Sequence, residues 1–81
     1  MKIELRLFAG IRDKIGTDVL HLYLSEPATI SALRQQLDAD YPVITPMLRH
    51  SNFAIDQTYA GENDVIPAGA IVACIPPVSG G

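Results

Sequence analysis

Apolar and polar residues alternate in two stretches near the start of the chain, residues 2–8 and 18–24. Because the side chains of a β-strand point alternately to opposite faces, this period of two predicts two strands, each with one buried face. The apolar positions are Ile3, Leu5, Leu7, Leu20, Leu22 and Leu24. A polar connection bracketed by Gly10 and Gly16 joins the two stretches. We therefore expect an antiparallel hairpin with a long loop.

A helical spacing follows in the next part of the chain. Over residues 30–40 the apolar residues recur at intervals that place them on one stripe, which predicts a helix that packs through that face. The stripe consists of Ile30, Leu33 and Leu37. Thr29 is a suitable N-cap for this helix, and Pro42 ends it. One further turn is expected over residues 46–50.

The second half of the chain predicts shorter elements separated by turns. Residues 53–55 indicate a short strand, and the segments 61–64 and 67–69 have the composition of turns. Residues 71–75 are apolar throughout, which is typical of a strand buried on most of both faces. The proline pair at 76–77 then ends the sheet.

The order of these elements predicts the fold class. Two strands, one helix and two further strands favour an α+β layer architecture, with one main helix packed on one face of a mixed sheet. The first and last strands lie on either side of the crossover, so we expect them to be parallel neighbours in the centre, as in a β-grasp (ubiquitin-like) fold. This domain is expected over residues 1–77, with an extended segment over 78–81. Most of the core is expected to consist of Ile3, Leu5, Leu7, Leu22, Ile30, Leu33, Leu37 and Val72.

Composition narrows the classes of protein. The 81 residues suffice for one domain, and the 48% of hydrophobic residues exceed what so small a core can hold, which favours an exposed apolar interface. A net charge of −3 with scattered basic residues argues against nucleic acid as a partner. No apolar run approaches the ~20 residues of a membrane span, and no signal peptide pattern opens the chain. With one cysteine, neither a disulfide nor a metal site is expected, and a cytoplasmic location is the expectation.

The C-terminal segment is the strongest candidate for chemistry. The two prolines at 76–77 favour a stiff, extended exit from the last strand. The four residues that follow can reach roughly 13 Å at ~3.3 Å each. Gly80 and Gly81 have no side chains and can enter a narrow channel. The Gly81 carboxylate is a poor acyl donor, but adenylation would activate it, and a sulfur nucleophile would then give a thiocarboxylate.

Three motifs stand out along the chain: Phe8-Ala9-x-x-Arg12 with Gly16, then Ala54-Ile55-Asp56-Gln57, then Pro76-Pro77-Val78-Ser79-Gly80-Gly81. Together they resemble those of a known family, the small subunits of molybdopterin synthase. The resemblance covers nearly the whole chain, and the ending is its most specific part. The chain departs from the family in having Asp56 where Asn is frequent, and Ala70-Ile71 where an acidic pair is frequent. These departures bear on which adenylating enzyme and which large subunit the chain recognises.

The resemblance implies a reaction cycle. An adenylating (E1-like) enzyme would use ATP to activate the Gly81 carboxylate, and a sulfur donor would convert it to a thiocarboxylate. The large subunit of molybdopterin synthase would then receive Gly80 and Gly81 and build the dithiolene of molybdopterin with this sulfur. In this scheme the chain binds no cofactor, and ATP is bound by the partner. The chain is not catalytic alone but is the sulfur-donating subunit of a sulfurtransferase complex.

A docking surface is expected beside the C-terminal segment. Phe8 falls on the polar face of its strand, so it is either a second-face core residue, an ordinary exposed aromatic or an anchor for a partner. Because the first and last strands are expected neighbours, Phe8 should lie near Ile75, and Tyr59 is a further candidate for the patch. The remaining candidate contacts with a partner are Pro76, Pro77, Val78 and Ser79.

Other readings of the sequence remain open. Cys74 invites the hypothesis that a thiol carries the sulfur, but its apolar strand without a flanking cation favours a buried, inert residue. A sulfur carrier of the thiamine pathway, or of another pathway in the same superfamily, is one alternative. A ubiquitin-like module that binds without covalent chemistry is another, although such a module has no need of a free Gly-Gly end.

Overall fold

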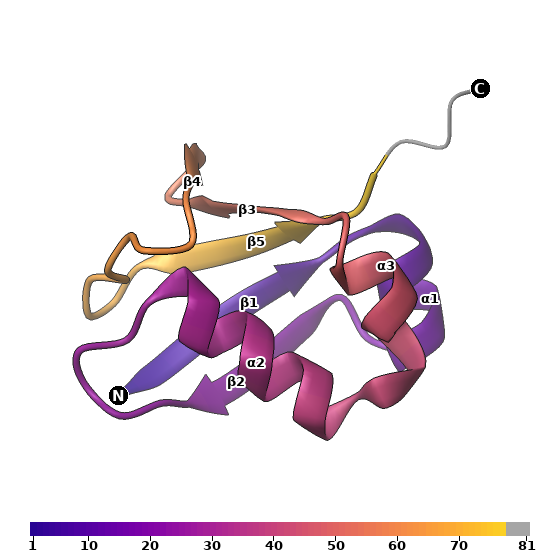
Figure 1. Cartoon of the computed structure of the whole chain (residues 1–81), viewed down its shortest axis with the longest axis horizontal. Helices are drawn as coiled ribbons and strands as arrows, with labels where there is room; N and C mark the ends of the chain where they lie inside the picture. The colour runs from indigo at the N-terminus through magenta and orange to yellow at the C-terminus, as the bar shows by residue number, and fades with distance from the viewer. Residues whose placement is uncertain (78–81) are drawn as a thin grey trace.

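The computed structural model describes residues 1–77 and has one mixed sheet with helices on one face (Figure 1). The strands are β1 (Lys2–Leu7), β2 (Val19–Tyr23), β3 (Asn52–Ile55), β4 (Thr58–Ala60) and β5 (Ile71–Ile75). The helices are α1 (Ala9–Ile15), α2 (Ile30–Asp40) and α3 (Thr45–Leu48), with a 3₁₀ turn, η1, at Pro42–Ile44. The α+β class and the ubiquitin-like β-grasp arrangement predicted from the sequence are confirmed.

The sheet has the strand order β2-β1-β5-β3-β4. The central pair, β1 and β5, is parallel, and every other pair is antiparallel. In the parallel register Leu5 lies opposite Val72 and Leu7 opposite Cys74. The expectation that the first and last strands are parallel neighbours is therefore confirmed.

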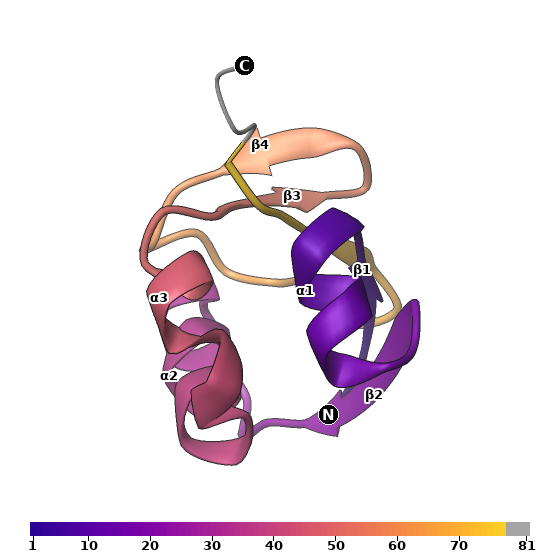
Figure 2. The same ribbon diagram turned by 90° about the vertical axis from the view of Figure 1, so that its right-hand side faces the viewer.

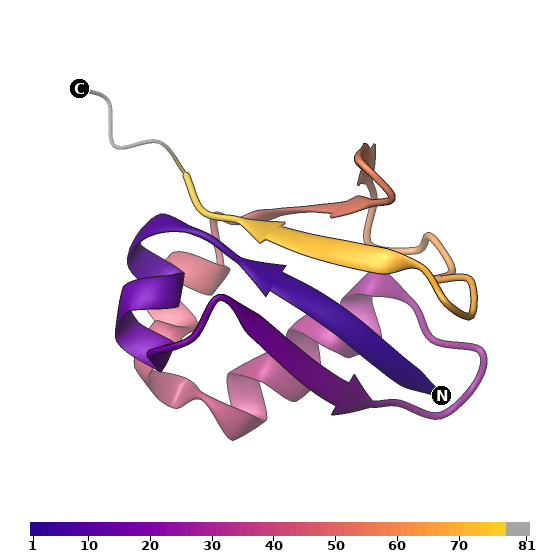
Figure 3. The same ribbon diagram turned by 180° about the vertical axis from the view of Figure 1, so that it is seen from behind.

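The helices cover one face of the sheet, which we call the inner face. Seen from behind, β2, β1 and β5 lie in front of α2 and α3 (Figure 3). All eight residues expected in the core are buried there. They are joined by others that the sequence pattern had not singled out, among them Ile11, Ile44, Leu48, Phe53 and Ile66. Within residues 1–77, no helix covers the opposite, outer face of the sheet, and none is long and apolar enough to cross a membrane.

The main helix begins and ends where its sequence predicts. The Thr29 hydroxyl accepts a hydrogen bond from the Ala32 amide at 3.1 Å, which satisfies one of the free N–H groups of the first turn of α2. The expected further turn exists as α3, one residue ahead of its predicted start. The turns at 61–64 and 67–69 are also present, each closed by a backbone hydrogen bond.

Two expectations about local structure were wrong, and one strand was not predicted. The connection after β1 is the helix α1 and not a polar loop: Ile11 is fully buried, and a left-handed Gly16 (φ 92°) ends the helix by donating to the Arg12 carbonyl. A seven-residue helix contains too few turns to show an apolar stripe. The strand β4 was not expected. Finally, β5 is buried on its inner face only, because Ile71, on the outer face, is 43% exposed.

Helices α1 and α3 lie at the end of the sheet from which β5 leads to Pro77 (Figure 1). Figure 2 looks onto this end and shows α1 on one side and α3 on the other. The end of β5 therefore emerges above two short helices.

Arg34 of α2 joins three separate parts of the chain. Its guanidinium donates two hydrogen bonds of 2.9 Å to the Glu62 carboxylate, and further ones to the carbonyls of Leu48 and Ser51. It also lies over the buried ring of Phe53, 4.9 Å from the centroid. The planar guanidinium can make these contacts at once because its donors form a rigid fork. Arg34 thus holds the 61–64 turn and the link between α3 and β3 against α2.

Replacing Arg34 with methionine should lower the free energy of unfolding by roughly 2–3 kcal/mol, since two backbone carbonyls and Glu62 lose their donor. Urea unfolding of the two proteins measures this difference. The matched control is Arg12→Met, which breaks only an exposed pair with Asp13 at 3.7 Å and should change the stability by less than about 0.5 kcal/mol. Equal effects of the two replacements would show that Arg34 is an ordinary surface residue.

Candidate functional site

The parallel pairing of β1 with β5 places Phe8 beside the end of the last strand. Leu7 lies opposite Cys74 in the register, so the residues that follow them, Phe8 and Ile75, are neighbours. Phe8 occupies the N-cap position of α1 and is 46% exposed, which is unusual for so large an apolar side chain. The expected position of Phe8 next to Ile75 is confirmed. Its role as an anchor stays a prediction.

A groove of about 510 Å³ lies where the chain leaves the sheet. We call it the exit groove, and its lining residues are Phe8, Ala9, Gly10, Met47, Ile75, Pro76 and Pro77. None of these side chains carries a charge, and the Met47 thioether is the only one with a heteroatom, a weak hydrogen-bond acceptor. The groove therefore suits apolar contact and provides no acid or base.

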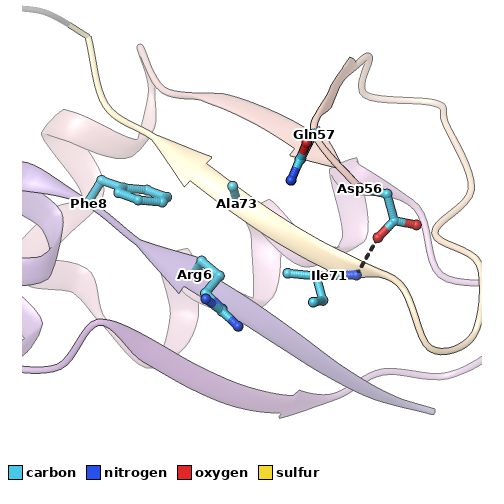
Figure 4. A pocket seen from close by; sticks show the side chains of 6 residues that line it. All are labelled: Arg6, Phe8, Asp56, Gln57, Ile71 and Ala73. Carbon is cyan, nitrogen blue, oxygen red and sulfur yellow. Dashed lines mark hydrogen bonds between the residues drawn. The ribbon is translucent and has the colours of Figure 1, made fainter.

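A second hollow, of about 470 Å³, lies on the outer face of the sheet (Figure 4). We call it the sheet hollow, and it is lined by Arg6, Phe8, Asp56, Gln57, Ile71 and Ala73. Phe8 lines both the sheet hollow and the exit groove, so its ring is the ridge between them. An aromatic ridge flanked by two hollows is a shape that a complementary protein surface can enclose.

The far wall of the sheet hollow is the turn between β3 and β4. Asp56 and Gln57 both have positive φ values, 46° and 72°. The Asp56 carboxylate accepts a hydrogen bond of 3.0 Å from the Ile71 amide, and the Asp56 amide donates to the Ile71 carbonyl at 2.9 Å. These two bonds attach the turn to the first residue of β5 (Figure 4 draws the former).

Tyr59 shares the outer face but lies apart from Phe8. The register places Arg6, Ala73, Ala54 and Tyr59 in one row across the sheet. Tyr59 is 70% exposed on the edge strand β4 and lines neither the exit groove nor the sheet hollow. Its contact with a partner stays a prediction, and the structure gives it a separate position on the same face.

A group of charged side chains lies on the part of the outer face formed by β1 and β2, away from Tyr59. Arg6 donates to the Glu4 carboxylate at 2.9 Å, and the other oxygen of Glu4 lies 3.9 Å from the His21 ring. These residues belong to β1 and β2, whereas the outer face of β5 and β3 consists of the exposed Ile71, the half-buried Ala73 and the buried Ala54. Sequence reasoning missed this group, since cross-strand partners become visible only once the register is known.

Cys74 is fully buried on the inner face of β5. Burial raises the pKa of its thiol from 9.0 to about 11, while a hydrogen bond with Ser51 and the charge of Arg34 act in the opposite direction. A thiol that is protonated and covered by the core cannot attack a partner. The expectation of a buried cysteine is therefore confirmed. Within residues 1–77, no cluster of three or more acidic, histidine or cysteine side chains is arranged to hold a metal.

The remaining candidate residues, Val78, Ser79, Gly80 and Gly81, lie outside the described residues. The predictions for them rest on the sequence alone.

Comparison with known proteins gives consistent matches over the full chain. The model of the ThiS family matches residues 5–81. The molybdopterin synthase sulfur carrier subunit of Chlamydomonas reinhardtii is 31% identical over 83 residues, which cover 100% of both chains. Among solved structures, SAMP1 from Haloferax volcanii has a TM-score of 0.86 at 24% identity, with 100% of both chains covered. The complex of subunits 1 and 2 of the molybdopterin-converting factor from Helicobacter pylori contains a chain with a TM-score of 0.72 at 21% identity, again with 100% of both chains covered.

The raised pKa of Cys74 predicts a loss of stability in alkali. The unfolded thiol ionises near 9 and the folded one near 11, so between these values the unfolded state binds fewer protons and gains population. Ionisation of the Cys74 thiol should therefore leave the free energy of unfolding unchanged below about pH 9 and should lower it between about pH 9 and 11. Urea unfolding as a function of pH measures this fall.

The control for this measurement is Cys74→Ala, which removes the thiol and keeps every other side chain. The alanine variant should be less stable at neutral pH, yet its stability should decline less steeply above pH 9. Parallel curves for the two proteins would mean that the thiol ionises as easily in the folded state as in the unfolded one.

Proposed function

The chain belongs to the ThiS family, and we propose that it is the sulfur-carrier subunit of a molybdopterin synthase. The observation that carries this proposal is the match, over the full length of both proteins, to a molybdopterin synthase sulfur carrier subunit. The terminal Pro76-Pro77-Val78-Ser79-Gly80-Gly81 sequence supports it, since a bare glycine end suits a carboxylate that must enter another protein's channel.

The sulfur is carried on the Gly81 carboxylate. In the first step this carboxylate attacks the α-phosphate of ATP, which forms an acyl-adenylate and releases pyrophosphate. Hydrosulfide from the sulfur donor then attacks the acyl carbon and expels AMP, which leaves a thiocarboxylate on Gly81. In the last step the thiocarboxylate sulfur forms a bond with the pterin precursor, and water hydrolyses the bond between this sulfur and the acyl carbon, which regenerates the Gly81 carboxylate. Two such transfers supply the two sulfur atoms of the molybdopterin dithiolene.

The chemistry is divided between the chain and its partners. The exit groove, the described surface closest to Gly81 along the chain, has no titratable side chain. Proton transfer and ATP binding therefore belong to the partners: an adenylating (E1-like) enzyme, a sulfur donor and the large synthase subunit. A large-subunit partner is supported by the Helicobacter pylori complex, in which a similar chain is one of two subunits.

The docking surface consists of the Phe8 ridge and the sheet hollow beside it. Large aromatic residues that fill a partner's pocket contribute most to the affinity of protein interfaces. Phe8 borders Ile75, Pro76 and Pro77, so a partner that takes up the C-terminal segment must come close to it. Tyr59 extends the same face toward the edge of the sheet.

A carrier for the thiamine pathway is the second candidate, because the ThiS family match is consistent with it. The two candidates share the Gly81 chemistry and differ in the acceptor of the sulfur. Incubating the thiocarboxylated protein with each pathway's acceptor protein and substrate distinguishes them by the product formed.

Deleting Gly81 should abolish sulfur transfer while leaving docking intact. The deletion moves the carboxylate back by about 3.3 Å, and a displacement of about 1 Å can already reduce a rate about 10²-fold. ATP–pyrophosphate exchange with the adenylating enzyme, followed by the intact mass of the carrier, measures the loss. The control is Gln35→Ala, an exposed change on α2 that leaves the C-terminal segment and its length intact and should be charged with sulfur as fast as the parent. If the shortened chain gains sulfur as fast as the parent, the carrier mechanism is wrong and a non-covalent binding module becomes the better description.

Replacing Phe8 with aspartate should weaken binding to the large subunit by about 2 kcal/mol or more, roughly 30-fold, as for other interface anchors. The fold should survive, because aspartate is a favourable N-cap and Phe8 makes no side-chain cap bond to α1. Calorimetry measures the affinity. Tyr23→Asp is the matched control: Tyr23 is 75% exposed on β2, lines neither hollow, and should leave the affinity unchanged. Equal affinities of the parent and the Phe8 variant would exclude Phe8 as an anchor.

A further inference from the structure

Met47 is the residue of the exit groove that α3 contributes. Phe8 lies at the start of α1, and Pro77 follows β5, so the groove joins three separate parts of the chain. The Met47 side chain lies against Gly10 of α1: a Cβ atom on Gly10 would lie 3.0 Å from its Cε and 3.2 Å from its Sδ. A side chain at position 10 would therefore press against the thioether, and glycine leaves room for it.

The position of the groove limits what can fill it. Pro77 lines the groove, and the four residues from 78 to 81 span at most about 14 Å. A protein that acts on the Gly81 carboxylate therefore has its surface within that distance of the groove. This step rests on the proposed function, because it requires Gly81 to react inside a partner.

We propose that the docking surface continues around the end of the sheet onto the α1–α3 side, where the exit groove receives an apolar side chain of the partner that takes up residues 78–81. The lining has no polar side chain, so an aliphatic or aromatic residue of that partner is the occupant whose burial is favourable. Met47 and Gly10 determine the shape of this pocket and act as specificity residues for docking.

A methionine in this wall suits a carrier that meets more than one protein. Its unbranched, polarisable side chain adapts to differently shaped apolar groups, as it does at other surfaces with several partners. The adenylating enzyme and the large subunit take up the same segment at different times. We expect both to use the groove, so one substitution should affect both affinities.

The test is the affinity of Met47→Glu for the large subunit and for the adenylating enzyme of the same organism, measured by calorimetry. Burying an unpaired carboxylate against an apolar group is unfavourable, so both affinities should fall roughly tenfold or more. Val43→Glu is the matched control: Val43 is 57% exposed and lines no part of the groove, and its variant should bind within about twofold of the parent.

A second variant separates docking from stability. Gly10→Ala adds a methyl group that pushes the end of Met47 into the groove, which should weaken both affinities several-fold. The same change raises the helix propensity of α1, so the melting temperature should stay equal or rise. Weaker binding by a protein that melts no earlier supports the groove as a docking pocket.

Four outcomes would overturn the inference. Parent-like affinity of Met47→Glu for both partners, while the parent itself binds, would reject the groove and leave the proposed function intact. Self-association of the parent that Met47→Glu abolishes, seen by sedimentation, would assign the groove to a second copy. A nuclear Overhauser effect between the Met47 methyl group and residues 78–81 in the free protein would assign the groove to the chain's own end. If the parent protein itself binds neither partner, the proposed function is wrong, and the inference that rests on it is wrong as well.

Discussion

Parallel pairing of β1 with β5 in the middle of the sheet is the constraint on which the rest of the structure depends. It joins the first and last strands of the chain, and two parallel neighbours need a crossover between them. The chain uses this crossover to place α2 and α3 on one face and to bury the inner side chains of both strands. The same pairing brings Phe8, which follows β1, beside the end of β5. The core and the candidate docking surface are therefore consequences of one register.

The uneven covering of the sheet explains how so short a chain combines stability with binding. A domain of 81 residues buries only about 60% of its unfolded surface. Here most of the buried side chains lie on the inner face. The outer face keeps a charged half on β1 and β2 and an apolar half on β5 and β3. Reactive groups are absent from the exit groove, which fits a subunit that delivers sulfur to catalytic residues elsewhere.

The sequence predicted the parts of the fold in which local pattern and burial agree. The alternation in β1 and β2 and the stripe of α2 matched the structure, because each has enough residues to show a period. Helix α1 was missed because Ile11 alone anchors its centre, and β4 because its turn uses Asp56 and Gln57 in place of the usual glycine. Of the site, Phe8 and Ile75 were predicted as neighbours, whereas Met47 was not, since it joins them only through the packing of α3.

The attachment of Asp56 to Ile71 has a thermodynamic consequence. The wall of the sheet hollow is fixed to β5 by two hydrogen bonds, both to backbone atoms of Ile71. The backbone of the turn and the Asp56 side chain are therefore held in place in the free protein, whereas the exposed Gln57 side chain is not. Ordering such groups on association costs about 0.5–1.5 kcal/mol for each immobilised side chain. The turn incurs little of this entropic loss, so a larger share of the contact energy in the hollow remains available as affinity.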